Sequence, residues 1–188
     1  MNSLFASLLT SAGLGAGAGL NAYATMLVFG LLARLRPETF TGELARFFAS
    51  TPVLTIVGLL YIIEFVADKI PAIDHVWDLV HTLIRPAAGA VVAWAAVSKG
   101  GLPHGAVIMA SVIAGTTALG AHAAKATTRA ASTLMTGGLG NPVLSLIEDV
   151  LAFAGALAAI LLPLLVLVVL LLMVLFFVVL ARRKRVQA

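Results

Sequence analysis

The chain has 188 residues, of which 61% are hydrophobic and 11% are charged, and its mean hydropathy is +1.10. An average soluble domain contains about 25% charged residues, so a water-soluble fold would leave too much apolar surface exposed to water. The chain contains no cysteine, which excludes a disulfide framework, thiol catalysis and thiolate metal sites. We therefore predict an all-α, polytopic transmembrane helical bundle in which 1–188 form a single integral membrane domain.

The formal net charge of +4 depends on a short basic run near the end of the chain. Arg182, Arg183, Lys184 and Arg185 directly follow an apolar stretch, and a basic run in this position marks the cytoplasmic side of a membrane. The sequence thus predicts that 182–188 form a basic cytoplasmic tail. It also predicts that the partner of the chain is the lipid bilayer and not a nucleic acid.

Taken in chain order, six apolar stretches are long enough for transmembrane spans of about 20 residues. Two of them open with a polar residue before a proline, Thr51-Pro52 and Asn141-Pro142, which is typical of a helix start capped by the polar side chain. The amino terminus lacks a basic region, so we expect the first apolar stretch to stay in the membrane and not to be cleaved as a signal peptide. The predicted helices lie near 6–34, 52–70, 74–98, 103–130, 142–161 and 163–181.

The number of spans depends on the apolar stretch at 150–181, in which Pro163 is the one turn signal. A single helix of this length would measure about 48 Å, more than the roughly 30 Å of a bilayer core, so we predict a division at Pro163 and six spans. With a cytoplasmic C-terminus, six spans would leave Arg34, Arg36 and Arg46 outside, whereas five spans would place them in the cytoplasm. The positive-inside rule therefore favours five spans, and both counts stay open.

A weak internal repeat favours six spans. The strings TPVLTI at 51–56 and NPVLSL at 141–146 match closely, and each follows a small-residue-rich helix, with GLNAYA in the first and GAHAAKA in the second. Two halves of three helices, 1–100 and 101–181, would then form an inverted repeat with broken helices and a site near the bilayer midplane. Chance recurrence of a short apolar string is the alternative.

Ionisable side chains recur at helical spacing in four of the predicted helices. Asp78, His81 and Arg85, for example, step by 3 and 4 residues and therefore share one helix face. Charges inside a membrane are costly and usually face the interior of a bundle, so we expect the polar faces to converge on one site that binds a substrate or an ion. The predicted site residues are Glu64, Asp68, Asp78, His81, Arg85, His122, Lys125, Arg129, Glu148 and Asp149.

The six carboxylates between Glu64 and Asp149 outnumber the Lys and Arg side chains of the same stretch. An uncompensated buried carboxylate either takes up a proton or binds a cation, which indicates a site that handles protons or other cations. Pro86, directly after Arg85, is expected to kink its helix and to free backbone carbonyls as further ligands. The alternative is that the polar faces only pair helices with one another and fix the fold.

The glycine-rich run at 13–19 lacks the spacing and the lysine of a phosphate-binding loop. It contains two overlapping GxxxG patterns, which allow close contact between helices. Asn21 and Tyr23 lie just beyond the run, and we expect them to add polar contacts to the site.

The polar faces also resemble those of a known family. EFVADKIPAIDHVWDLVHTLIRPAAGA at 64–90, HAAKATTRA at 122–130 and NPVLSLIEDVLA at 141–152 resemble the domain of unknown function 4126 family of small bacterial integral membrane proteins. The resemblance implies a location in the bacterial plasma (inner) membrane and supplies no established activity.

The predicted function is that of a small secondary transporter or channel-like carrier for an ion or a small polar or anionic solute, with a lipid headgroup as a variant. In this hypothesis the acids bind the coupling proton or cation, the bases hold an anionic group, and the chain forms a homo-oligomer.

Two other classes of function stay open. Asp74 and Asp78, together with the acids of the preceding helix, would hold Mg²⁺ in a metal-dependent intramembrane enzyme that acts on a phosphorylated lipid. A structural or assembly protein would use the charges only for pairing helices. We favour a protein that is not an enzyme, and the sequence assigns no catalytic residue, cofactor or metal.

Overall fold

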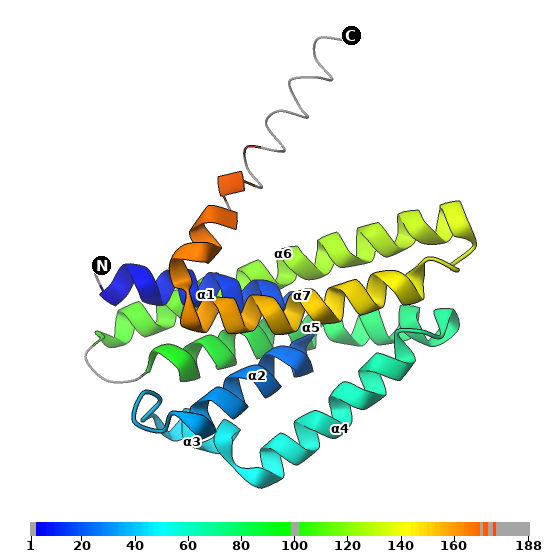
Figure 1. Ribbon diagram of the computed structural model, residues 1–188. Coiled ribbons are helices and arrows are strands. Elements are labelled where there is room, and N and C mark those ends of the chain that lie inside the picture. Colours follow the sequence, from blue (N-terminus) through cyan, green and yellow to red (C-terminus); the bar gives the residue numbers. More distant parts are fainter. Residues whose placement is uncertain (1–2, 99–101, 170, 173–174, 176–188) are drawn as a thin grey trace.

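The computed structural model describes residues 3–98, 102–169, 171, 172 and 175, apart from the side chains of Ser3 and of 71–78. All regular secondary structure in these residues is helical, which confirms the predicted all-α class (Figure 1). Residues 163–169 are also helical. The helices are α1 (Ser3–Leu20), α2 (Ala22–Leu35), α3 (Glu43–Ala49), α4 (Thr51–Ala67), α5 (Pro71–Val97), α6 (His104–Thr136) and α7 (Asn141–Leu161).

Within the described residues, three segments are long and apolar enough to cross a membrane: Leu79–Val97 of α5, all of α6 and all of α7. A fourth span results if α3 and α4, which are bent by 62° relative to each other, count as one. The helices α1 and α2 are apolar but shorter, and the predicted span at 163–181 lies partly outside the described residues. This arrangement is that of a helical membrane bundle.

The chain reverses direction at Asn21, so the single helix predicted over 6–34 is instead two helices that run in opposite directions (Figure 1). Ala6 in α1 and Arg36 just after α2 line the same hollow, which places the outer ends of the two helices side by side. Asn21 makes the break, because its backbone is extended (φ −148°, ψ 109°) and its side chain accepts a hydrogen bond from Ala24 N at 2.9 Å, which caps α2. The pair forms a helical hairpin, and its tip at 21–23 is buried in the bundle.

The helix α1 is wedged between α6 and α7, because small residues let the backbones approach closely. A Cβ atom at Gly15 would overlap the main chain of Ala114 in α6, and one at Gly13 would lie 2.5 Å from the Cβ of Ala159 in α7. The overlapping GxxxG patterns thus pack against two different helices, which confirms the predicted close contact. Since α1 also packs against α5, it occupies the centre of the bundle.

The helices α4 and α7 begin one residue earlier than the sequence predicts. Ser50, and not Thr51, is the residue before α4. Gly140, and not Asn141, precedes α7. The following proline therefore takes the second helical position, where an N–H has no partner within the helix in any case. The Asn141 side chain does not cap α7 but donates to Thr133 Oγ1 at 3.0 Å, across the turn from α6.

The two halves expected from the internal repeat follow different paths. The first half reverses at Asn21, whereas α6 continues without interruption through His122, the matching position in the second half. The inverted repeat therefore stays an unconfirmed prediction. The helix α5 also continues through Pro86, so this proline does not break the helix beside the predicted site.

A break does occur at Pro163, as predicted. The helix α7 ends at Leu161, and the helical residues 163–169 leave it at a steep angle (Figure 1). These described residues do not fold back along α7 as the two arms of a hairpin would. The predicted cytoplasmic tail at 182–188 lies outside the described residues.

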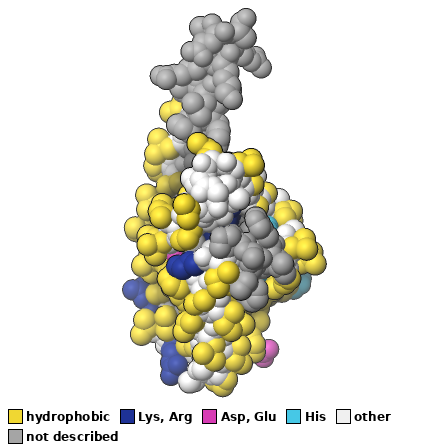
Figure 2. Space-filling model, turned by 90° about the vertical axis from the view of Figure 1, so that its right-hand side faces the viewer, with side chains coloured by type: hydrophobic (Ala, Val, Ile, Leu, Met, Phe, Trp, Pro, Cys, Tyr) yellow, Lys and Arg dark blue, Asp and Glu magenta, His cyan; other side chains and the backbone are white. Residues whose placement is uncertain are grey.

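Hydrophobic side chains cover much of the outside of the bundle. Ile56, Leu59 and Ile63 of α4 are between 49% and 57% exposed, as expected for side chains that contact lipid. Figure 2 shows that hydrophobic atoms dominate one side of the molecule, with only scattered Lys, Arg, Asp, Glu and His atoms. Seven Asp, Glu, Lys and Arg side chains of the described residues are instead buried inside the bundle.

Candidate functional site

The predicted polar faces converge inside the bundle, where the end of α4 meets α5, α6 and α7. This confirms the predicted convergence, while a role in binding a solute stays a prediction. The tenth predicted residue, Asp78, has a side chain outside the described part of the chain. The nine described residues are all buried: Glu64, Asp68, His81, Arg85, His122, Lys125, Arg129, Glu148 and Asp149.

One ion-pair network joins α4, α5 and α6. Arg85 Nη2 donates to Glu64 Oε1 at 2.9 Å, and His81 Nε2 lies 3.8 Å from the same oxygen. Arg85 Nη1 lies 2.5 Å from His122 Nδ1, and His122 Nε2 lies 3.1 Å from Thr82 Oγ1. Because a guanidinium has only donors, His122 accepts at Nδ1 and holds its proton on Nε2. Arg85 therefore neutralises Glu64, and a neutral His122 orients the guanidinium.

A second network joins α4, α6 and α7 through two acids and two bases. Arg129 Nη2 donates to Asp68 Oδ2 at 2.8 Å and to Glu148 Oε2 at 2.5 Å. Lys125 Nζ lies 3.1 Å from Asp68 Oδ2 and 3.4 Å from Glu148 Oε2. Burial acts to raise the pKa of Asp68, which lies just beyond α4, but Lys125 and Arg129 outweigh burial and hold that pKa below its ordinary value. Each acid faces both bases, so the charges of this network cancel.

The hairpin tip reaches this cluster from the centre of the bundle. The carbonyl of Leu20, which the end of α1 leaves without a helical partner, accepts a hydrogen bond from Lys125 Nζ at 3.1 Å. Asn21 Nδ2 donates to Asp149 Oδ1 at 2.8 Å. The break between α1 and α2 thus places one backbone acceptor and one side-chain amide among the charged residues.

Asp149 differs from the other acids of the cluster. The described residues give it no ion-pair partner, whereas Glu64, Asp68 and Glu148 each pair with Arg or Lys. Its Oδ2 atom is buried and has no hydrogen-bond donor among the described residues. One oxygen of Glu64 and one of Asp68 also lack a donor there, but the other oxygen of each is held by an arginine. Asp149 is therefore the one acid of the cluster that no described base approaches to ion-pair distance, while the positive charges of Lys69 and Lys125 act on it from farther away.

The three cationic side chains of the cluster, Arg85, Lys125 and Arg129, are all engaged by carboxylates. This arrangement does not support the predicted role of the bases in holding an anionic group. Among the described side chains, no group of three or more His, Asp or Glu residues is placed to share one metal ion. Asp74 and Asp78, which the sequence suggested for magnesium, have side chains outside that set.

Sequence reasoning anticipated part of the surroundings of the cluster and missed part. The predicted polar contact of Asn21 is confirmed. Tyr23 also reaches the cluster, but through its ring, which meets the His81 ring edge to face with centroids 5.6 Å apart, so its predicted polar contact stays a prediction. Thr82 was missed, although its position between His81 and Arg85 on α5 could have suggested it. The Leu20 carbonyl could not be found from the sequence, because it is available only where the chain breaks.

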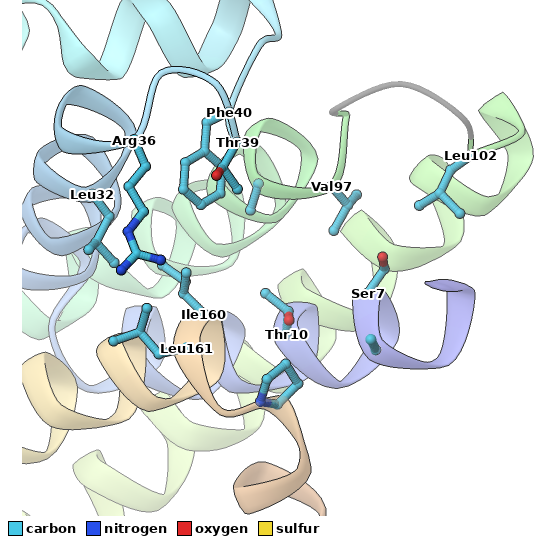
Figure 3. Close-up of a pocket in the computed structure, with 13 residues that line it drawn as sticks. Ser7, Thr10, Leu32, Arg36, Thr39, Phe40, Val97, Leu102, Ile160 and Leu161 are labelled. Atoms are coloured by element: carbon cyan, nitrogen blue, oxygen red, sulfur yellow. The ribbon is translucent and has the colours of Figure 1, made fainter. Parts of the chain in front are cut away.

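A separate hollow of about 320 Å³ lies at the opposite end of the bundle (Figure 3). Arg36 extends over it toward Ile160, and the hydroxyl groups of Ser7, Thr10 and Thr39 lie around it. None of the predicted site residues lines this hollow, so it is distinct from the charged cluster.

The chain belongs to the family described as domain of unknown function (DUF4126), whose model matches residues 8–183. The match covers nearly the whole chain and includes the charged cluster and the hairpin tip. No curated protein and no solved structure matches the chain. The family match confirms the resemblance seen in the sequence, and the family has no established activity. The geometry of the charged cluster is therefore the main indication of function.

Proposed function

We propose that this chain is a small proton-coupled secondary carrier of a cationic solute, and that Asp149 is the group that exchanges a proton for the solute. The observation that supports this most directly is that Asp149 is a buried carboxylate with no ion-pair partner among the described residues. In a low-dielectric interior, a lone carboxylate takes up a proton or binds a cation, because its isolated anion is strongly disfavoured.

The other acids are less suited to this role. Neutralising Glu64 or Glu148 would leave Arg85 or Arg129 with less compensation in a buried ion pair, and breaking such a pair costs several kcal/mol, about 3–5. Asp149 can change its protonation without breaking an ion pair among the described residues, although its hydrogen bond to Asn21 and its longer-range attraction to Lys69 and Lys125 change. The two balanced networks would then hold the helices together while Asp149 titrates.

The hairpin tip links a change of charge at Asp149 to a change of shape. Irregular backbone at membrane depth is tolerated where it is buried in protein or lines a cavity, and broken helices form the sites of many secondary transporters. Because Asn21 bonds to Asp149 and the adjacent Leu20 carbonyl bonds to Lys125, the tip would respond directly to protonation or solute binding at this carboxylate.

A structural or assembly function is the second candidate, and the two balanced ion-pair networks favour it. Such a protein would need the paired residues for stability but would have no use for a titrating Asp149. Three further predictions remain: that the chain forms a homo-oligomer, that it lies in the bacterial plasma membrane, and that its C-terminus is cytoplasmic. Cross-linking in membranes would test the oligomer, and a C-terminal reporter fusion would test the location of the C-terminus.

The proposal predicts that Asp149→Asn abolishes proton-coupled movement while the protein stays folded. The measurement uses proteoliposomes that contain a pH-indicating dye, with Na⁺, K⁺, choline, ethanolamine or tetraphenylphosphonium added outside. We expect at least one of these cations to change the internal pH with the wild-type protein and none to do so with the variant. Asn at this position can still accept from Asn21, so thermal unfolding in detergent should stay within about 1 kcal/mol of wild type, the range typical of one neutral hydrogen bond.

Glu43→Gln is the matched control, since Glu43 is an exposed acid on α3 far along the chain from the cluster, and it should behave like the wild type. Full activity of the Asp149→Asn protein, or a wild-type protein that moves protons with none of the cations, would contradict the carrier proposal.

A further inference from the structure

A groove of about 440 Å³ runs along the outside of the bundle between α2, α4 and α7. Its walls are apolar, with Val28 from α2 and Phe153 and Leu157 from α7. Tyr61 of α4 faces Phe153 across it, and the two rings meet edge to face with centroids 5.3 Å apart. The volume lies within the range of about 300–1,000 Å³ that is usual for small-molecule sites.

The groove opens toward the apolar outer surface of the bundle. Leu146 and Val150 line it and are 53% and 58% exposed, and Leu157 is 42% exposed. Exposed Ile62 and Ile63 on α4 continue the apolar surface on the neighbouring helix. A ligand could therefore enter sideways from the hydrocarbon region, without crossing water.

Asp149 is the one carboxylate among the described residues that line this groove. It is 4% exposed, and its Oδ2 atom has no donor among the described residues. An apolar groove with a single carboxylate that has no ion-pair partner among the described residues is complementary to a positive charge on an apolar body. A bare inorganic cation would lack the six or more oxygen ligands that Ca²⁺ or Mg²⁺ requires, and an anion would be repelled.

We propose that this groove binds amphiphilic organic cations, in which a quaternary ammonium or phosphonium centre is attached to an apolar body, and that it takes them from the membrane. The inference rests on the proposed carrier function, for which it names the substrate class. Asp149 pairs with the positive centre, and Tyr61 and Phe153 offer ring faces or edges to it and to its apolar groups. The apolar walls bury the remainder of the ligand.

The test is equilibrium dialysis of tetraphenylphosphonium against the full-length protein in detergent. Tetraphenylborate is the matched probe, because it has almost the same shape and the opposite charge. We expect saturable binding of the phosphonium and none of the borate, and Asp149→Asn should weaken phosphonium binding by more than about tenfold, since a charge pair in a low-dielectric site is lost.

A second variant tests the groove without touching the carboxylate. Ala154 lines the groove and is exposed, so Ala154→Trp should fold and fill the space, with a similar loss of phosphonium binding. Thr10→Val, in the separate hollow at the other end of the bundle, should leave binding unchanged. Equal binding of phosphonium and borate, or undiminished phosphonium binding to either groove variant, would overturn the inference.

The two proposals can fail separately. If the phosphonium does not bind but a small cation still moves protons through Asp149, the groove inference is wrong and the carrier proposal stands. If the phosphonium binds through Asp149 but no cation moves protons in proteoliposomes, the groove is a binding site and the carrier proposal is wrong.

Discussion

Replacing Arg129 with Met is expected to destabilise the protein by about 3–5 kcal/mol, because it leaves Asp68 and Glu148 buried with one base between them. Thermal unfolding of the purified protein in detergent measures the effect. The loss should be among the largest for any single substitution, since Arg129 is 2% exposed and bonds to both acids.

The double variant R129M/E148Q provides the control for this result. It leaves Asp68 and Lys125 as a one-to-one pair, 3.1 Å apart, and should recover much of the lost stability. Arg34→Met should have little effect, because Arg34 is exposed and bonds only to Thr51 in the described part of the chain. A double variant that is less stable than the single one would show that the network does not act through charge balance.

Gly15→Ala is expected to lower the free energy of unfolding, because it disturbs the packing at the centre of the bundle. The added Cβ would overlap the carbonyl oxygen of Ala114 and lie 2.8 Å from its Cα, and a main chain cannot move aside as a side-chain end can. Overpacking of this kind costs about 1–3 kcal/mol and sometimes more, and unfolding in detergent would register it.

Gly120→Ala is the matched control, because Gly120 is an exposed glycine in a helix and nothing lies within 4 Å of the added atom. It should be neutral or stabilising by up to about 1 kcal/mol, since alanine is the better helix former. Equal effects of the two substitutions would mean that α1 is not packed against α6 as described.

Sequence spacing predicted the charged cluster well, because residues three and four apart must share a helix face and charges must avoid lipid. It could not predict the pairing. Glu148 and Asp149 are neighbours in the chain, but one faces Lys125 and Arg129 whereas the other faces Asn21 and the groove. Adjacent helical residues point in directions about 100° apart, and only the positions of the other helices decide which of them meets a base.

The break at Asn21 was harder to predict. The stretch 6–34 reads as one apolar span with no proline, and Asn21 is a modest signal within it. Its partner Asp149 lies 128 residues away. The hydrogen bond that stabilises the break therefore cannot be predicted from the residues around Asn21. The apparent match between the two halves did not indicate the break either, because His122, the position that matches Asn21, lies in an uninterrupted helix.

The central position of α1 also constrains how the protein is made. The hairpin of α1 and α2 leaves the ribosome before Lys125 and Asp149 have been translated, although these residues satisfy its tip. A polar backbone group without a partner in hydrocarbon costs several kcal/mol, so the unpartnered Leu20 carbonyl disfavours placing the early hairpin in lipid on its own. We therefore expect the hairpin to reach its final position only after α6 and α7 have been made, so that one of the first segments to be translated is among the last to be packed.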